Sequence, residues 1–156
     1  MAIPCNPADA TAKKIADKCD AEFAGNKTDC NKFVKAALGP FLGAGYFDGL
    51  DADGIVGKLK KAGEGWTASR KISVAIAQAK AGKVVIAGMT SVDLGQQHGH
   101  LAVVVGCDGQ LSDTIIVPLG YAGSIDAEDK RLSGGRLSGT FKAAWVREEK
   151  IDYYYK

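Results

Sequence analysis

A chain of 156 residues that is 46% hydrophobic and 24% charged has the size and composition of one domain with a single core. Its formal net charge of +2 is too small to indicate nucleic-acid binding, and no basic cluster alternates with aromatic residues. No apolar run is long enough to span a membrane, and the first residues lack the pattern of a Sec signal peptide. We therefore expect one domain over residues 1–156 that binds neither nucleic acid nor membrane.

The first half of the chain has the periodicity of helices. Apolar residues recur three and four positions apart, which places them on one face of a helix. A glycine follows each such segment and predicts the end of the helix, and Pro40 reinforces this signal after the second one. The predicted helices cover residues 8–23, 30–38, 55–59 and 69–81.

Cys30 stands at the start of the second predicted helix, directly after a polar turn. Thr28 or Asp29 can cap the free backbone N–H groups there. These N–H groups and the helix dipole favour an anion, so we expect the thiolate of Cys30 to be favoured over the thiol. Cys30 is therefore a candidate nucleophile; the alternative is a small buried hydrophobic residue.

The second half of the chain has the pattern of strands. Short β-branched runs predict strands over residues 83–87, 101–107, 111–117, 141–146 and 151–155. Asp108-Gly109 predicts a hairpin turn, and residues 118–139 are expected to be a long loop. Helices followed by strands predict an α+β fold with the N-terminal helices packed on a mostly antiparallel sheet.

His100 opens the predicted central strand and is the candidate base for Cys30, since cysteine–histidine pairs are usually assembled by the fold from distant segments. His98 competes for this role because alternation puts both histidines on the same strand face. A metal site made of His98, His100 and Cys107 is the weakest alternative, because Cys107 lies at the far end of the strand. We expect no metal and no cofactor.

The chain has four cysteines: Cys5, Cys19, Cys30 and Cys107. No C-x-x-C pair occurs, and the spacing fits no structural zinc site. Cys5 and Cys19 are able to form a disulfide in an oxidising compartment, a question that the sequence leaves open. Cys107 is expected to be a packing residue.

The stretches Asp29-Cys30-x-x-Phe33-Val34 and Gly99-His100-Leu101-Ala102-Val103-Val104 resemble the NlpC/P60 and CHAP peptidases. These are papain-like cysteine hydrolases that cut amide bonds in bacterial peptidoglycan. The resemblance implies a papain-like NlpC/P60 fold with Cys30 as nucleophile and His100 as base. It also implies a third group that orients the imidazole. Asp113 and Ser124 are possible, and the backbone carbonyl of Ala122 is the leading interpretation.

In its small size and its lack of a Sec signal, the chain most resembles the amidase effectors of type VI secretion. This resemblance implies a toxin that is made in the cytoplasm and delivered by the type VI apparatus into the periplasm of a rival cell. The bond implied lies in the peptide stem, between D-glutamate and meso-diaminopimelate. The alternatives are the cross-link between two diaminopimelates and a non-catalytic cell-wall binding module. A periplasmic immunity protein is the expected partner, and residues 39–54 and 118–139 are expected to form the rim that it covers.

Overall fold

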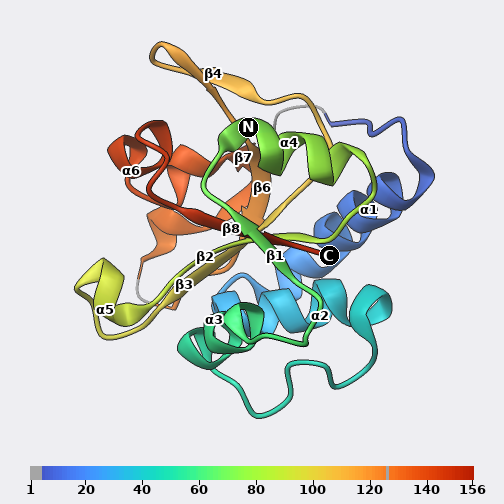
Figure 1. The fold of residues 1–156 in the computed structure, drawn as a ribbon, viewed down its shortest axis with the longest axis vertical. Helices are drawn as coiled ribbons and strands as arrows, with labels where there is room; N and C mark the ends of the chain where they lie inside the picture. The colour runs from blue at the N-terminus through green and yellow to red at the C-terminus, as the bar shows by residue number, and fades with distance from the viewer. Residues whose placement is uncertain (1–4, 126) are drawn as a thin grey trace.

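The computed structural model describes residues 5–125 and 127–156, which build a six-stranded sheet with helices on both faces (Figure 1). The strands are β1 (Thr67–Ser69), β2 (Val85–Met89), β3 (His100–Val104), β6 (Leu119–Ala122), β7 (Leu132–Arg136) and β8 (Asp152–Tyr155). Their order across the sheet is β1-β8-β2-β3-β6-β7, and neighbouring strands are antiparallel. The prediction of an α+β fold with an antiparallel sheet is confirmed.

Two sets of helices enclose this sheet. The helices α1 (Ala10–Asn26), α2 (Cys30–Leu42) and α3 (Ala52–Lys60) pack on one face. The opposite face is covered by α4 (Ile72–Lys80), the 3₁₀ helix η2 (Leu137–Gly139) and α6 (Ala143–Arg147). Two short helices, α5 (Ser91–Leu94) and the 3₁₀ helix η1 (Glu128–Lys130), lie in the connections.

Strands β2 and β3 are buried on both faces, which explains why the sequence shows continuous apolar runs there. Ile86, Leu101 and Val103 point into the core under α1–α3. Ala102 and Val104 alternate with them and point toward α4 and α6. The central strands thus form a rigid support, and His100 stands at the first position of β3.

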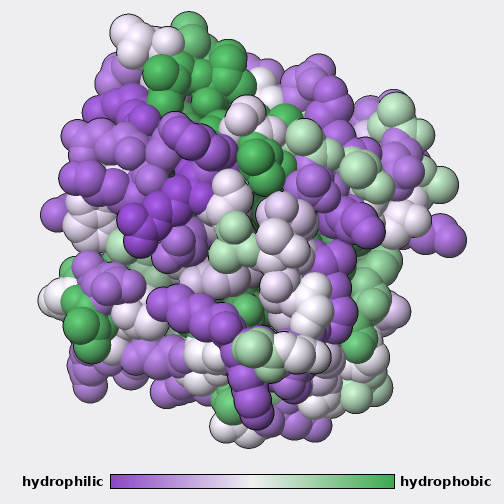
Figure 2. Space-filling view, viewed as in Figure 1, coloured by the Kyte–Doolittle hydropathy of each residue, from purple (hydrophilic) through white to green (hydrophobic). Residues whose placement is uncertain are grey.

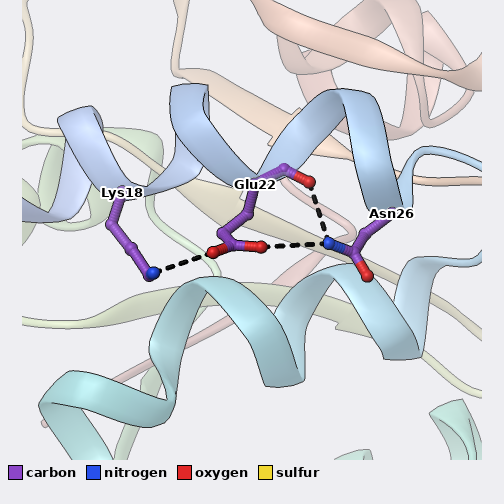
Figure 3. Close-up of polar contacts among 3 residues, drawn as sticks. All are labelled: Lys18, Glu22 and Asn26. Carbon is purple, nitrogen blue, oxygen red and sulfur yellow. Dashed lines mark hydrogen bonds and ion pairs between the residues drawn. The ribbon is translucent and has the colours of Figure 1, made fainter.

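Helix α1 ends at Asn26, one residue beyond the predicted stop at Gly25. The Asn26 side chain donates to the Glu22 carbonyl oxygen at 2.9 Å and to the Glu22 carboxylate at 3.2 Å (Figure 3). Lys18 holds the same carboxylate from the preceding turn, at 2.7 Å. These side-chain contacts link successive turns of α1 at its C-terminal end.

The prediction that Gly39-Pro40 ends the second helix is wrong, because α2 continues through Pro40 to Leu42. Proline removes one helical hydrogen bond. Phe41 and Leu42 pack against the core beyond it, and this packing outweighs the lost bond. Gly43, with φ of 108°, then ends the helix and donates its N–H to Gly39.

The predicted hairpin turn at Asp108-Gly109 is also wrong. The hairpin consists of β4 (Gln110–Ser112) and β5 (Ile115–Val117), and its turn contains Asp113 with φ of 55°. It forms a separate two-stranded sheet. Leu111 and Ile116 face each other across it and are exposed, and Figure 2 shows a hydrophobic patch over this region.

Three further segments have a secondary structure other than the predicted one. Residues 118–139 contain β6 and β7 instead of a long loop. Most of the strand predicted over residues 141–146 is helix α6, and the segment before α4 contains strand β1. Each of these segments is short, so the tertiary contacts with the sheet and its covering helices decide its conformation.

The disulfide joins Cys5 to Cys107, with their Cα atoms 5.7 Å apart. Cys107 is therefore a disulfide partner, and its interpretation as a packing residue alone was wrong. The possible Cys5–Cys19 pair does not form, since Cys19 is a free thiol buried in the core under α1. The bond fastens the segment before α1 to the segment that follows β3.

Candidate active site

Cys30 is the first residue of α2, as the capping pattern predicted. The cap is Asp29, whose carboxylate accepts from the N–H groups of Asn31 at 2.9 Å and Lys32 at 3.3 Å. A further backbone hydrogen bond, from Ser124 N–H to the Lys27 carbonyl at 2.9 Å, fixes the preceding turn to the end of β6. The cysteine therefore sits on a well-anchored helix start.

Gly99 brings the histidine strand close to Cys30. The Cys30 Sγ lies 3.9 Å from the Gly99 carbonyl oxygen, to which the thiol donates a long hydrogen bond. A Cβ atom at position 99 would overlap the Asp53 carboxylate and lie 2.9 Å from the Met89 carbonyl oxygen. Glycine is thus required immediately before His100, which explains the Gly-His pair in the sequence.

The His100 ring is oriented by Thr140. The distance from His100 Nε2 to Thr140 Oγ1 is 2.6 Å, and Thr140 Oγ1 donates to the Lys130 carbonyl oxygen at 2.6 Å. A hydroxyl has one proton to donate, so Thr140 accepts from His100 and the imidazole carries its proton on Nε2. Phe141 packs against the ring with centroids 4.9 Å apart. The Nδ1 lone pair is left as the proton acceptor.

Thr140 takes the place of the three groups that the sequence analysis considered for orienting the imidazole. Asp113, in the turn of the β4–β5 hairpin, forms an ion pair with Arg147 of α6 at 3.1 Å. Ser124 accepts from the Ala127 N–H, and Ala122 lies in the core. Thr140 follows His100 by 40 positions in a segment between η2 and α6, and no sequence motif marks a single threonine of this kind.

Burial sets the protonation of the pair. It raises the pKa of the Cys30 thiol from 9.0 to about 11, helped by the Asp29 charge and opposed by N–H groups that include those of Leu101 and Asn31. It lowers the pKa of His100 from 6.5 to about 4, and the nearby Lys130 ammonium acts in the same direction. Both groups are therefore neutral at pH 7. The expectation that the helix start favours the thiolate is wrong for the protein without substrate, because desolvation of the thiolate outweighs its stabilisation by the N–H groups of the helix.

Cys30 and His100 line one open cleft of about 610 Å³. We define its cysteine wall as Cys30, Asn31 and Asp51 to Asp53, and its histidine wall as His100, Lys130, Thr140, Phe141, Lys142 and Trp145. Leu94 and residues 96–99 form a further side of the cleft, and Ser124, Ile125 and Ala127 contribute from the segment after β6.

The predicted rim is correct only in part. The cleft takes residues 51–53 from the predicted segment 39–54 and several residues of 118–139. Lining residues from 140–145 lie outside both predicted segments, and so does the loop that holds Leu94 and residues 96–99. Asp53 ties it down, because its carboxylate accepts from the backbone N–H and the hydroxyl of Ser91 in α5.

His98 lines the same cleft but is exposed, whereas His100 is half-buried and hydrogen-bonded. The metal site proposed from His98, His100 and Cys107 is excluded because the Cys107 sulfur is bonded to Cys5. His100 is therefore the histidine with the environment of a positioned base.

Comparison with models of known protein families gave no match for this chain, and comparison with curated proteins gave none either. Across residues 5–125 and 127–156, no helix is both long enough and apolar enough to cross a membrane.

Proposed function

We propose that this protein is a cysteine hydrolase of amide bonds. The observation that carries the proposal is that Cys30 and His100 line one cleft while Thr140 fixes the His100 ring with its Nδ1 lone pair free. A chain of hydrogen bonds that orients the base from behind is typical of a catalytic histidine. A binding module requires neither a nucleophile at a helix start nor an oriented imidazole.

In the proposed reaction, each of these groups has one role. His100 Nδ1 takes the proton of Cys30 Sγ as the sulfur attacks the amide carbon, since both groups are neutral before the substrate arrives. The Cys30 N–H at the start of α2 donates to the resulting oxyanion. The imidazolium then gives its proton to the leaving amine, which leaves a thioester on Cys30. Water, deprotonated by His100, hydrolyses the thioester and restores the thiol.

The proposed substrate is the peptide stem of bacterial peptidoglycan, cut between D-glutamate and meso-diaminopimelate. The sequence resemblance to NlpC/P60 amidases and type VI effectors supports this choice. A cysteine-bearing helix packed on an antiparallel sheet that carries the histidine agrees with a papain-like NlpC/P60 fold. As such an effector, the protein would act in the periplasm of a rival cell, and its producer would carry a periplasmic immunity protein.

Digestion of purified sacculi with mass spectrometry of the fragments tests this proposal. New termini at D-glutamate and diaminopimelate are expected from the wild type and not from Cys30→Ala. Termini between two diaminopimelates would instead identify the cross-link as the substrate. Binding to sacculi without any fragments would show a non-catalytic module and overturn the hydrolase proposal.

Expression with and without a periplasmic signal tests the site of action. Cells with the protein in the cytoplasm are expected to grow, and cells that export it are expected to lyse. Cys30→Ala with the same signal is the matched control. Growth arrest that is equal in both compartments would contradict action on the cell wall.

A further inference from the structure

The charged side chains of the cleft are unevenly distributed between its walls. The carboxylates of Asp51 and Asp53 lie on the cysteine wall, and Lys130 and Lys142 lie on the histidine wall. The Asp53 carboxylate is occupied by Ser91. Within residues 5–125 and 127–156, no ion pair joins the ammonium of either lysine to a carboxylate. The histidine wall therefore offers positive charge to whatever enters the cleft.

The two lysines are positioned by different contacts. The Thr140 hydroxyl donates to the Lys130 carbonyl oxygen at 2.6 Å, so the backbone of Lys130 is held against the residue that orients His100. Lys142 follows two positions after Thr140 and immediately precedes α6. Its Nζ lies 4.8 Å from the centroid of the Trp145 ring, which also lines the cleft. This stacking gives the Lys142 side chain a defined position along the wall.

The charge of Lys130 reaches the reacting groups. Lys130 lines the same cleft as His100, and its carbonyl oxygen accepts from the hydroxyl that orients the imidazole. In keeping with this placement, its ammonium also helps to lower the pKa of His100. A substrate with its scissile carbonyl on Cys30 and its leaving amine at His100 therefore lies beside this ammonium. Any anionic group next to the scissile bond would be stabilised there by charge-assisted hydrogen bonds.

We propose that Lys130 and Lys142 form a subsite for a free carboxylate on the residue adjacent to the scissile amide. This inference rests on the proposed function and narrows its substrate class. A stem in which D-glutamate is linked through its side-chain carboxyl keeps a free α-carboxylate beside the cut bond. A stem in which this group is a carboxamide has no charge to pair with the lysines, so the enzyme prefers the stem with the free carboxylate.

The test compares two synthetic stem tetrapeptides that differ only at the D-glutamate α-position, one with a free carboxylate and one with a carboxamide. The wild type is expected to prefer the carboxylate by about tenfold in kcat/KM, as for a lost hydrogen bond to a charged group. Lys130→Gln and Lys142→Gln should each raise KM for the carboxylate peptide and leave KM for the carboxamide unchanged. Lys130→Gln retains the backbone carbonyl that accepts from Thr140.

Lys14→Gln is the matched control. Lys14 is exposed on α1, so this substitution removes the same charge at a position outside the cleft. Equal cleavage of both peptides by the wild type would overturn the subsite while leaving the hydrolase proposal intact. Equal losses on both peptides in the lysine variants would overturn it as well. The wild type could also cut neither peptide and still cleave sacculi at a different bond in a Cys30-dependent way. This result would contradict both the proposed bond and the subsite.

Discussion

The two walls of the cleft are held by contacts of different range. On the cysteine wall, the position of Cys30 follows mainly from its own helix and from Asp29, the residue before it, with one long-range backbone hydrogen bond from Ser124 to Lys27. On the histidine wall, the orientation of His100 depends on Thr140 and, through it, on Lys130. These residues come from separate segments that meet only in the folded sheet.

This difference predicts how each wall responds to change. Cys30 is held mainly by its local cap, and the long-range bond from Ser124 N–H to the Lys27 carbonyl joins backbone atoms, so the geometry around Cys30 should survive most side-chain substitutions elsewhere in the molecule. The histidine wall depends on a chain of two hydrogen bonds between distant segments, and loss of one member leaves a buried polar group without a partner. Function is therefore expected to be more sensitive to substitutions behind His100 than to substitutions behind Cys30.

The largest effect is expected for the two reacting residues, one from each wall. Cys30→Ala and His100→Ala should each lower kcat on peptidoglycan by at least about 10³-fold, as for removal of a covalent catalyst or its base. Both variants should remain folded by circular dichroism. His98→Ala is the control and should retain most of the activity. Equal losses at His98 and His100 would mean that the base is misassigned.

The pH dependence tests the histidine wall. His100 must be unprotonated to act as base and its pKa is about 4, so kcat/KM should fall about tenfold per pH unit below pH 4 and stay level through neutral pH. Lys130→Gln removes a charge that lowers this pKa and should move the acid limb to higher pH. A wild-type limb near pH 6.5 would contradict a buried, neutral base.

The same pKa shift has a consequence for stability. The folded state resists protonation of His100 between pH 6.5 and 4, while the unfolded chain accepts the proton, so stability decreases as the pH falls through this range. The loss expected from this group is about 3 kcal/mol at pH 4. Denaturant unfolding of the wild type and of His100→Gln at several pH values measures this loss, which should be absent in the variant. The same curves show the pH range in which the enzyme stays folded during the kinetic assay.

A smaller effect is expected at Thr140. Thr140→Val keeps the shape of the side chain and removes both hydrogen bonds, so kcat should fall about 5- to 150-fold, corresponding to one unsatisfied buried group. KM should change little, because the substitution disturbs the base and not the substrate contacts. Thr140→Ser retains the hydroxyl and should recover most of the loss. A Thr140→Val variant with wild-type kcat would show that His100 needs no orienting partner.

The smallest effect is expected on the cysteine wall, at Asp29. Asp29→Ser keeps a capping oxygen and removes a charge that raises the pKa of Cys30. Alkylation of Cys30 by iodoacetamide at neutral pH should therefore become faster, while thermal stability stays close to that of the wild type. Asp29→Ala also removes the cap and should cost about 1 kcal/mol of stability. Slower alkylation of Asp29→Ser would contradict the assigned effect of the carboxylate.

The local parts of the fold were predictable from the sequence. The polar turn and the apolar periodicity of residues 30–38 predicted a helix that starts at Cys30, and the β-branched run after His100 predicted a buried strand. Both signals depend on neighbours within one or two turns of the chain, so the sequence contains all the information they need. They indicated both candidate catalytic residues.

The remaining features depend on segments that are distant in the sequence. Thr140 lies 40 positions from His100, and the Cys5–Cys107 disulfide spans 102 positions. Short segments such as β6 and α6 carry weak local preferences, so contacts with the sheet and its covering helices decided their conformation. Burial likewise decided that Cys30 and His100 are both neutral, because the loss of hydration depends on the packed core and outweighs the local effect of the helix start.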